Sequence, residues 1–140
     1  MTPPLTKLLP VPTPETQPYW DAARDGELRL QRCEECATVR AYPQSSCATC
    51  GSQKYDWFAA SGRATLYSYV ISHRPAPGFT PPFVIALVQL EEGPRMLSNV
   101  VDVPPDPEHL PLDLPLTVRF EDRGTIVVPV FAPSGKGDAA

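Results

Sequence analysis

All four cysteines of the chain lie within residues 33–50, as two pairs with the same internal spacing. Cys33 and Cys36 form one C-x2-C pair, and Cys47 and Cys50 form the other. Each pair predicts a tight turn whose backbone N–H groups can point at the sulfurs, and two facing turns complete a tetrahedral thiolate site. The spacing C-x2-C-x10-C-x2-C is typical of zinc. Because four protein ligands fill the coordination sphere, such a zinc would be structural rather than catalytic.

Other chemistries of four cysteines must be weighed against zinc. Rubredoxin-type iron uses the same four thiolates, so the spacing leaves iron open. Two disulfides would require an oxidising compartment, and no secretion signal is recognisable at the N-terminus. A redox C-x-x-C motif is normally a single pair beside a turn from strand to helix. Gly51, directly after the second pair, suits a turn that needs positive φ, whereas the first pair is followed by Ala37.

The segments around the cysteines predict a small ribbon over residues 27–60. Residues 27–32 (ELRLQR) alternate apolar and polar side chains, which indicates a strand that leads into the first turn. Residues 54–58, which follow the second cysteine pair, should form another strand and pair with a similar segment. A ribbon this short cannot build a core of its own, so we expect metal binding to supply most of its folding free energy.

A short helix is expected before the ribbon, within the N-terminal arm of residues 1–26. Thr16 is the predicted N-cap and Gly26 the stop. Tyr19, Trp20 and Ala23 share one face of this helix. A helix of this length is marginal alone, so that face packs either on the protein's own ribbon or on a partner subunit.

Five strand-like runs follow the ribbon, at residues 64–73, 83–91, 95–102, 116–121 and 125–131. Five short strands without a long helix favour a closed barrel of the OB type over an open sheet with unpaired edges. Pro129 favours an edge or a bulge in the last run. The fold class is therefore mainly β: a short N-terminal helix, a rubredoxin-like ribbon, a five-stranded OB-fold barrel over residues 61–133, and a disordered tail at 134–140.

Composition narrows the possible partners. The chain has 140 residues, 19 prolines and a formal net charge of −4. From residue 75 onward, four Lys or Arg stand against nine Asp or Glu, a net charge of −5. An acidic barrel half argues against a nucleic-acid surface, because such surfaces neutralise phosphates. No apolar run approaches the roughly 18 residues of a membrane helix, so we expect a soluble, cytoplasmic protein without a membrane partner.

The order of these elements resembles the DUF35 family of zinc-ribbon/OB-fold proteins, from about residue 19 to residue 133. The resemblance rests on the segments YWDAARDGELRLQRCEEC, CATCGS, SGRATLYSYV, FVIALVQLEEGPRMLSNVVD, LTVRFEDRG and VPVF. Ala37 and Ala48 depart from the family, which usually has Gly and Pro there, as does DLPLTV, where a glycine is usual before the strand. These departures affect only details of the cysteine turns and of the turn before the strand.

The resemblance implies an accessory subunit that is not catalytic by itself. Its expected partner is a thiolase-superfamily or lipid-transfer-protein-like subunit, and the complex would act as an aldolase, thiolase or acyltransferase on a CoA thioester held partly by the barrel. The resemblance also implies that the partner surface includes the helix of Tyr19 and Trp20. A nucleic-acid-binding protein is the alternative, because ribbons and OB barrels also serve that purpose.

Candidate CoA contacts follow from the chemistry of that ligand, whose phosphates and adenine need cations and an aromatic face. His73, Arg74 and Phe79 on the proline-rich loop of residues 73–82 offer these groups, and Arg95 after a hairpin turn is a second phosphate candidate. No catalytic set is visible in the sequence. If all four cysteines bind metal, none remains as a nucleophile.

Overall fold

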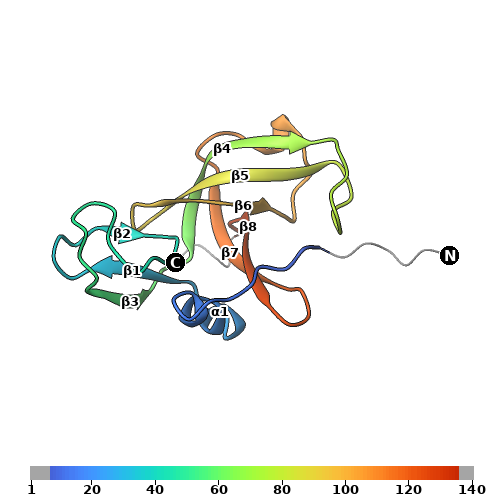
Figure 1. Cartoon of the computed structure of the whole chain (residues 1–140). Coiled ribbons are helices and arrows are strands. Elements are labelled where there is room, and N and C mark those ends of the chain that lie inside the picture. Colours follow the sequence, from blue (N-terminus) through green and yellow to red (C-terminus); the bar gives the residue numbers. More distant parts are fainter. Residues whose placement is uncertain (1–6, 136–140) are drawn as a thin grey trace.

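The computed structural model describes residues 7–135 (Figure 1). In chain order the elements are α1 (Gln17–Arg24), β1 (Arg29–Cys33), β2 (Val39–Arg40), β3 (Tyr55–Ala59), β4 (Arg63–Ser72), β5 (Phe83–Leu90), β6 (Arg95–Val100), the 3-10 turn η1 (Pro107–His109), β7 (Pro115–Asp122) and β8 (Val127–Pro133). The fold is thus mostly β with one short helix, as the sequence predicts. Within these residues no helix is long and apolar enough to cross a membrane.

Five strands close a barrel in the order β4-β5-β6-β8-β7. Alternation places one side of each strand inside, and the interior includes Leu66, Val88 and Phe131, each fully buried. The barrel is closed least tightly between β6 and β8, which pair only at Val100 and Phe131. Pro129 pairs with Phe120 of β7, and its carbonyl accepts a hydrogen bond from the Ser98 hydroxyl of β6 over 3.1 Å. β8 thus lies between two strands and not at an edge, and Pro129 occupies a position that has no ladder pair on β6.

The ribbon is a three-stranded sheet in the order β2-β1-β3, and it lies beside one end of the barrel (Figure 1). Leu28, Leu30 and Ala41 of the ribbon segment belong to the same buried cluster as the barrel interior. The ribbon therefore shares the core of the barrel. This sharing compensates for a segment too short to enclose a core alone.

Helix α1 packs against both modules, since it contacts β1 of the ribbon and β8 of the barrel. Its buried side chains are Tyr19, Ala22 and Ala23, whereas Trp20 is only half-buried. Ala22 lies three residues after Tyr19 and so shares its face. Thr16 is at the N-cap, but its side chain makes no capping bond. Of the two alternatives for this helix, the structure shows that Tyr19 packs within the chain itself.

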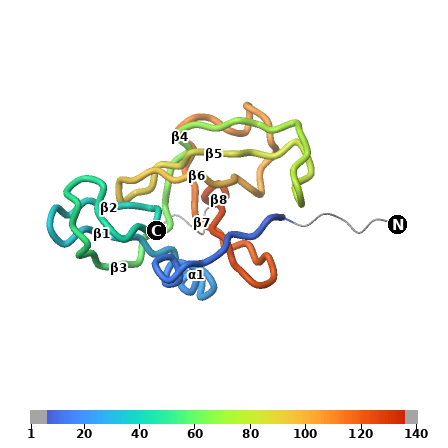
Figure 2. Tube along the Cα trace, viewed as in Figure 1, coloured from blue at the N-terminus to red at the C-terminus, as the bar shows by residue number. Residues whose placement is uncertain are grey.

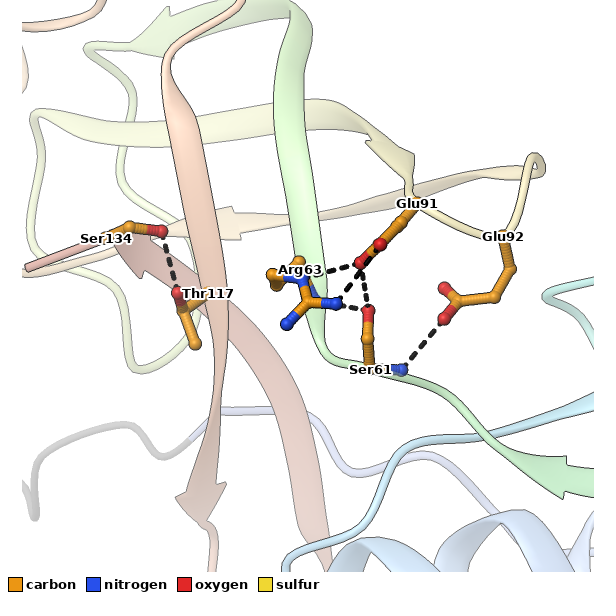
Figure 3. Close-up of polar contacts among 6 residues, drawn as sticks. All are labelled: Ser61, Arg63, Glu91, Glu92, Thr117 and Ser134. Atoms are coloured by element: carbon orange, nitrogen blue, oxygen red, sulfur yellow. Dashed lines mark hydrogen bonds and ion pairs between the residues drawn. The ribbon is translucent and has the colours of Figure 1, made fainter. Parts of the chain in front are cut away.

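A polar cluster fixes the short link between ribbon and barrel (Figure 3). Arg63 Nε, at the start of β4, donates to a carboxylate oxygen of Glu91 over 2.7 Å, and the Ser61 hydroxyl donates to the same oxygen over 2.7 Å. The Ser61 N–H donates to Glu92 over 2.8 Å. Both glutamates belong to the turn between β5 and β6. The link is thus held by a turn 30 residues away, which limits rotation of the ribbon.

The predicted module boundaries fall at residues 26/27 and 60/61, and the elements change at α1/β1 and β3/β4. The predicted arm lies within the described residues only from Lys7 onward, where it runs below the barrel into α1 (Figure 2). Most of the predicted disordered tail, residues 136–140, lies outside the described residues. The boundaries and the tail remain predictions.

Candidate functional site

The two cysteine pairs form turns with the same backbone hydrogen bonds. In the first turn, the N–H of Ala37 donates to the carbonyl of Cys33 over 2.9 Å; in the second, the N–H of Gly51 donates to the carbonyl of Cys47 over 2.8 Å. Gly51 has a φ of +78°, as expected, and Ala37 adopts nearly the same conformation with a φ of +63°. The first turn therefore keeps its shape despite the side chain, in a region disfavoured for L-residues other than glycine.

The geometry of the four sulfurs fits a single tetrahedral metal ion. All four Sγ atoms lie within 4.8 Å of one another, and the Cys33–Cys50 and Cys36–Cys47 separations are 3.6 and 3.7 Å. A tetrahedron with Zn–S bonds of about 2.3 Å has edges of about 3.8 Å. Cys33 and Cys47 are buried while the other two are exposed, so the ion would sit at the edge of the ribbon.

Hydrogen-bond donors in the turns favour the thiolate form at Cys47 and Cys36, whereas the neighbouring Cys33 side chain raises the pKa of Cys50. The backbone N–H groups of Cys50 and Thr49 lower the pKa of Cys47 to about 6. The hydroxyl and then the N–H of Thr38 lower the pKa of Cys36. These donors would neutralise part of the charge on a thiolate-bound ion. Four cysteine ligands leave no open position, so this centre can stabilise the ribbon but cannot hold a substrate.

The proline-rich loop brings some of the predicted CoA contacts together. His73 and Arg74 are exposed at its start. Phe79 is half-buried: its ring stacks on Phe83 with centroids 4.8 Å apart, and the ammonium of Lys7 lies 4.4 Å from its centroid. Phe79 thus anchors the loop and the arm, and its ring forms a wall of two hollows. His73 and Arg74 do not line these hollows.

Arg95 lies apart from the loop, at the other end of β5 and β6. It pairs in register with Gln89, whereas the loop joins β5 at Phe83. Six residues of strand separate these points, roughly 20 Å. The Arg95 guanidinium stacks over Tyr67, 3.7 Å from the ring centroid, and its Nε donates to Gln89. The structure does not place the four predicted contacts in one pocket, and their role stays a prediction.

Sequence reasoning missed an apolar hollow of about 240 Å³ where α1, the ribbon and the barrel meet. Trp20, Tyr42, Leu97 and Pro129 are among its lining residues. The Tyr42 hydroxyl accepts a hydrogen bond from the N–H of Leu97 over 2.7 Å, which ties the ribbon to the loosely closed edge of the barrel. No local signal marks this contact, because its partners are 55 residues apart.

Two family models together cover most of the chain, and they meet within β3, the last strand of the ribbon. Residues 20–56 match a model described as "ChsH2, rubredoxin-like zinc ribbon domain", and residues 57–121 match "ChsH2, C-terminal OB-fold domain". The DUF35 chain of a solved "Ltp2-ChsH2(DUF35) aldolase" superposes with a TM-score of 0.79 at 33% sequence identity. The match covers 89% of this chain and 98% of that one.

The chain belongs to the DUF35 family. The expected zinc-ribbon and OB-fold architecture is thereby confirmed, and the zinc-ribbon match together with the four clustered thiols supports a structural zinc.

Two curated relatives of this DUF35 chain are longer proteins. One is a "Probable enoyl-CoA hydratase alpha subunit" of Thermomonospora curvata, 36% identical over 118 residues that cover 83% of this chain and 36% of the relative. Another is the "3-oxo-4,17-pregnadiene-20-carboxyl-CoA hydratase alpha subunit" of Mycobacterium tuberculosis, 37% identical over 109 residues that cover 77% and 34%. The chain spans about one third of the length of these two relatives.

Proposed function

We propose that this DUF35 chain is an accessory subunit of a heteromeric enzyme that acts on CoA thioesters. Its partner would be a thiolase-superfamily protein, specifically one of the lipid-transfer type, and the complex would cleave or form a carbon–carbon bond. The observation that carries this proposal is the likeness to the DUF35 chain of the Ltp2-ChsH2 aldolase, which this chain matches over nearly that chain's whole length. The names of the two hydratase subunits support a CoA thioester as the ligand.

The side chains of this protein support an accessory role. The four cysteines form one closed thiolate centre. Within residues 7–135, neither histidine is hydrogen-bonded to a cysteine, serine or threonine side chain, and the ring of His109 instead contacts Asp106 over 2.6 Å in the turn η1. A nucleophile beside a base is the usual requirement for covalent catalysis. The reaction centre would therefore belong to the partner.

The proline-rich loop is the proposed contact with the CoA moiety. Arg74 would bind a phosphate as an exposed guanidinium, with His73 beside it, and Phe79 would form an apolar wall for the pantetheine arm rather than stack on adenine. Arg95 lies roughly 20 Å away along β5, so it could meet only a distant part of an extended ligand.

The test uses the purified chain and the lipid-transfer-like protein of the same organism, produced separately. The substrate is a β-hydroxyacyl-CoA, and release of the shortened carbonyl product is followed by chromatography. We expect turnover from the mixture and none from this chain alone; cleavage by the isolated chain would overturn the accessory role.

Arg74→Ala should raise KM for the CoA thioester more than kcat falls. Arg29→Ala, which replaces an exposed arginine of the ribbon, should change neither.

A further inference from the structure

The outer face of β4, β5 and β6 carries apolar side chains that the chain leaves open to solvent. Strand register places Val70 beside Ile85, and Leu87 beside Leu97. Val70 and Leu97 are each 60% exposed, while Ile85 and Leu87 are half-buried. These four residues are called here the β4–β6 face, which lies along the upper side of the barrel in Figure 1.

The sequence of β5 indicates that this face is normally covered. A barrel strand with one side exposed to solvent should alternate apolar and polar residues. The first six residues of β5, FVIALV, are instead all apolar, a pattern typical of strands buried on both sides. Its inward side fills the barrel with Val84, Ala86 and Val88. The outward side has no comparable cover among the described residues.

Leu97 stands between two apolar hollows. On the side of the proline-rich loop, a hollow of about 350 Å³ has Phe79, Phe83 and Ile85 among its lining residues. On the other side is the hollow of about 240 Å³ that includes Trp20 and Tyr42. Leu97 lines both. Pockets of this kind receive the large side chains that carry most of the binding energy at protein interfaces.

The charges around the face select the partner. β4, β5 and β6 contain no Asp or Glu, although the protein has a net charge of −4. Exposed arginines stand at opposite ends of the face: Arg95 at the end of the β5–β6 turn and Arg74 after β4. Neither forms an ion pair within residues 7–135. An apolar centre with a cationic rim complements a protein surface with an apolar centre and carboxylates around it.

We infer that the β4–β6 face and its two hollows form the docking surface for the partner subunit. The partner offers two or more large apolar side chains, one to each hollow, and acidic groups to Arg95. This inference rests on the proposed function, because the occupant is the lipid-transfer-like subunit named there. It keeps Trp20 at the interface, as the wall of one hollow, and leaves Tyr19 in the core of this chain.

The experiment measures binding of the lipid-transfer-like protein from the same organism by calorimetry. Leu97→Glu and, separately, Val70→Glu place a carboxylate in the apolar centre, on side chains that are already largely exposed. Val11→Glu is the matched control, since Val11 is 84% exposed on the N-terminal arm, outside the β4–β6 face. Melting temperature and zinc content show that each variant is folded. An Arg95→Glu variant is titrated at low and high salt.

We expect each face variant to weaken binding at least tenfold and the control to bind like the wild type. We also expect the Arg95→Glu variant to lose part of the salt dependence seen in the wild type. Wild-type binding that both face variants retain would overturn this surface and leave the proposed function standing. No wild-type binding would overturn both. Self-association of the wild type that Leu97→Glu abolishes, without partner binding, would assign the face to a second copy and also overturn the inference.

Discussion

Replacing Tyr19 by alanine should destabilise the protein by about 3–4 kcal/mol. The Tyr19 side chain is only 7% exposed and belongs to the common core, and its ring meets Trp20 edge to face with centroids 4.9 Å apart. A buried tyrosine removes roughly 150 Å² or more from water, worth about 4 kcal/mol at 25 cal/mol per Å². Truncations of buried aromatic residues lose about 3–5 kcal/mol, which agrees.

The assay is thermal unfolding of the zinc-loaded protein. At about 2.1 cal/mol/K per residue, a chain of 140 residues has an unfolding entropy of roughly 0.3 kcal/mol/K. The melting temperature of Tyr19→Ala should therefore fall by about 10 °C. Tyr19→Phe keeps the ring and should melt within a few degrees of the wild type. If Tyr19→Ala melts like the wild type but loses its partner, α1 is an interface helix and the packing argument is wrong.

The pH dependence gives an independent check of the same burial. Burial, and secondarily the nearby Tyr42, raise the pKa of Tyr19 above its ordinary value of 10. The folded state therefore holds this proton more tightly than the unfolded state. The contribution to stability is complete below about pH 10 and is lost as pH rises toward the folded pKa. Tyr19→Phe should consequently lose less stability between pH 9 and 11 than the wild type does.

Three further changes test the metal turns and the link. Cys47→Ser should abolish binding of one zinc per chain and unfold the ribbon while the barrel keeps much of its sheet signal by circular dichroism; iron in the wild type, or disulfides under reducing conditions, would contradict the zinc assignment. Ala37→Gly should raise stability by about 0.5–1 kcal/mol, because φ is positive there, and an unchanged or lower melting temperature would refute the strain. The hydrogen bond from Arg63 lowers the pKa of Glu91. The Arg63–Glu91 pair therefore contributes to the stability of the folded protein above about pH 4.5, and this contribution is lost as pH falls further. Glu91→Gln should thus be less stable than the wild type at pH 7, with a difference that shrinks as pH falls below 4.5, and equal stability at pH 7 would show that the link needs no ion pair.

Each of the two metal turns could be predicted from the sequence because the hydrogen bond that closes it is local. The spacing of Cys33, Cys36, Cys47 and Cys50 thus indicates two turns of the same shape, and the strands of the ribbon bring their sulfurs within 4.8 Å. Gly51 signalled one turn directly. Ala37 did not, since alanine carries no preference for positive φ, and only the structure shows that it adopts this conformation.

The strands could also be predicted from the sequence, because the alternation of apolar and polar residues and the turn residues are local signals. Their bounds moved by a few residues: β8 spans Val127–Pro133 where residues 125–131 were predicted. The two-residue strand β2 and the extra residue Tyr67, where β4 shifts register against β5, had no such signal. Short or irregular pairing depends on the neighbouring strand and not on the segment itself.

Only the tertiary structure decided where the apolar side chains without a place in the barrel would go. The sequence left two alternatives for the helix face of Tyr19 and Trp20. In the structure Tyr19 is buried in the common core, whereas Trp20 packs against that core and stays partly exposed. The Tyr42–Leu97 bond joins residues 55 positions apart, and the Lys7–Glu121 ion pair joins residues 114 apart. Such contacts depend on how the ribbon, the arm and the barrel close on one another, and no window of neighbouring residues contains that information.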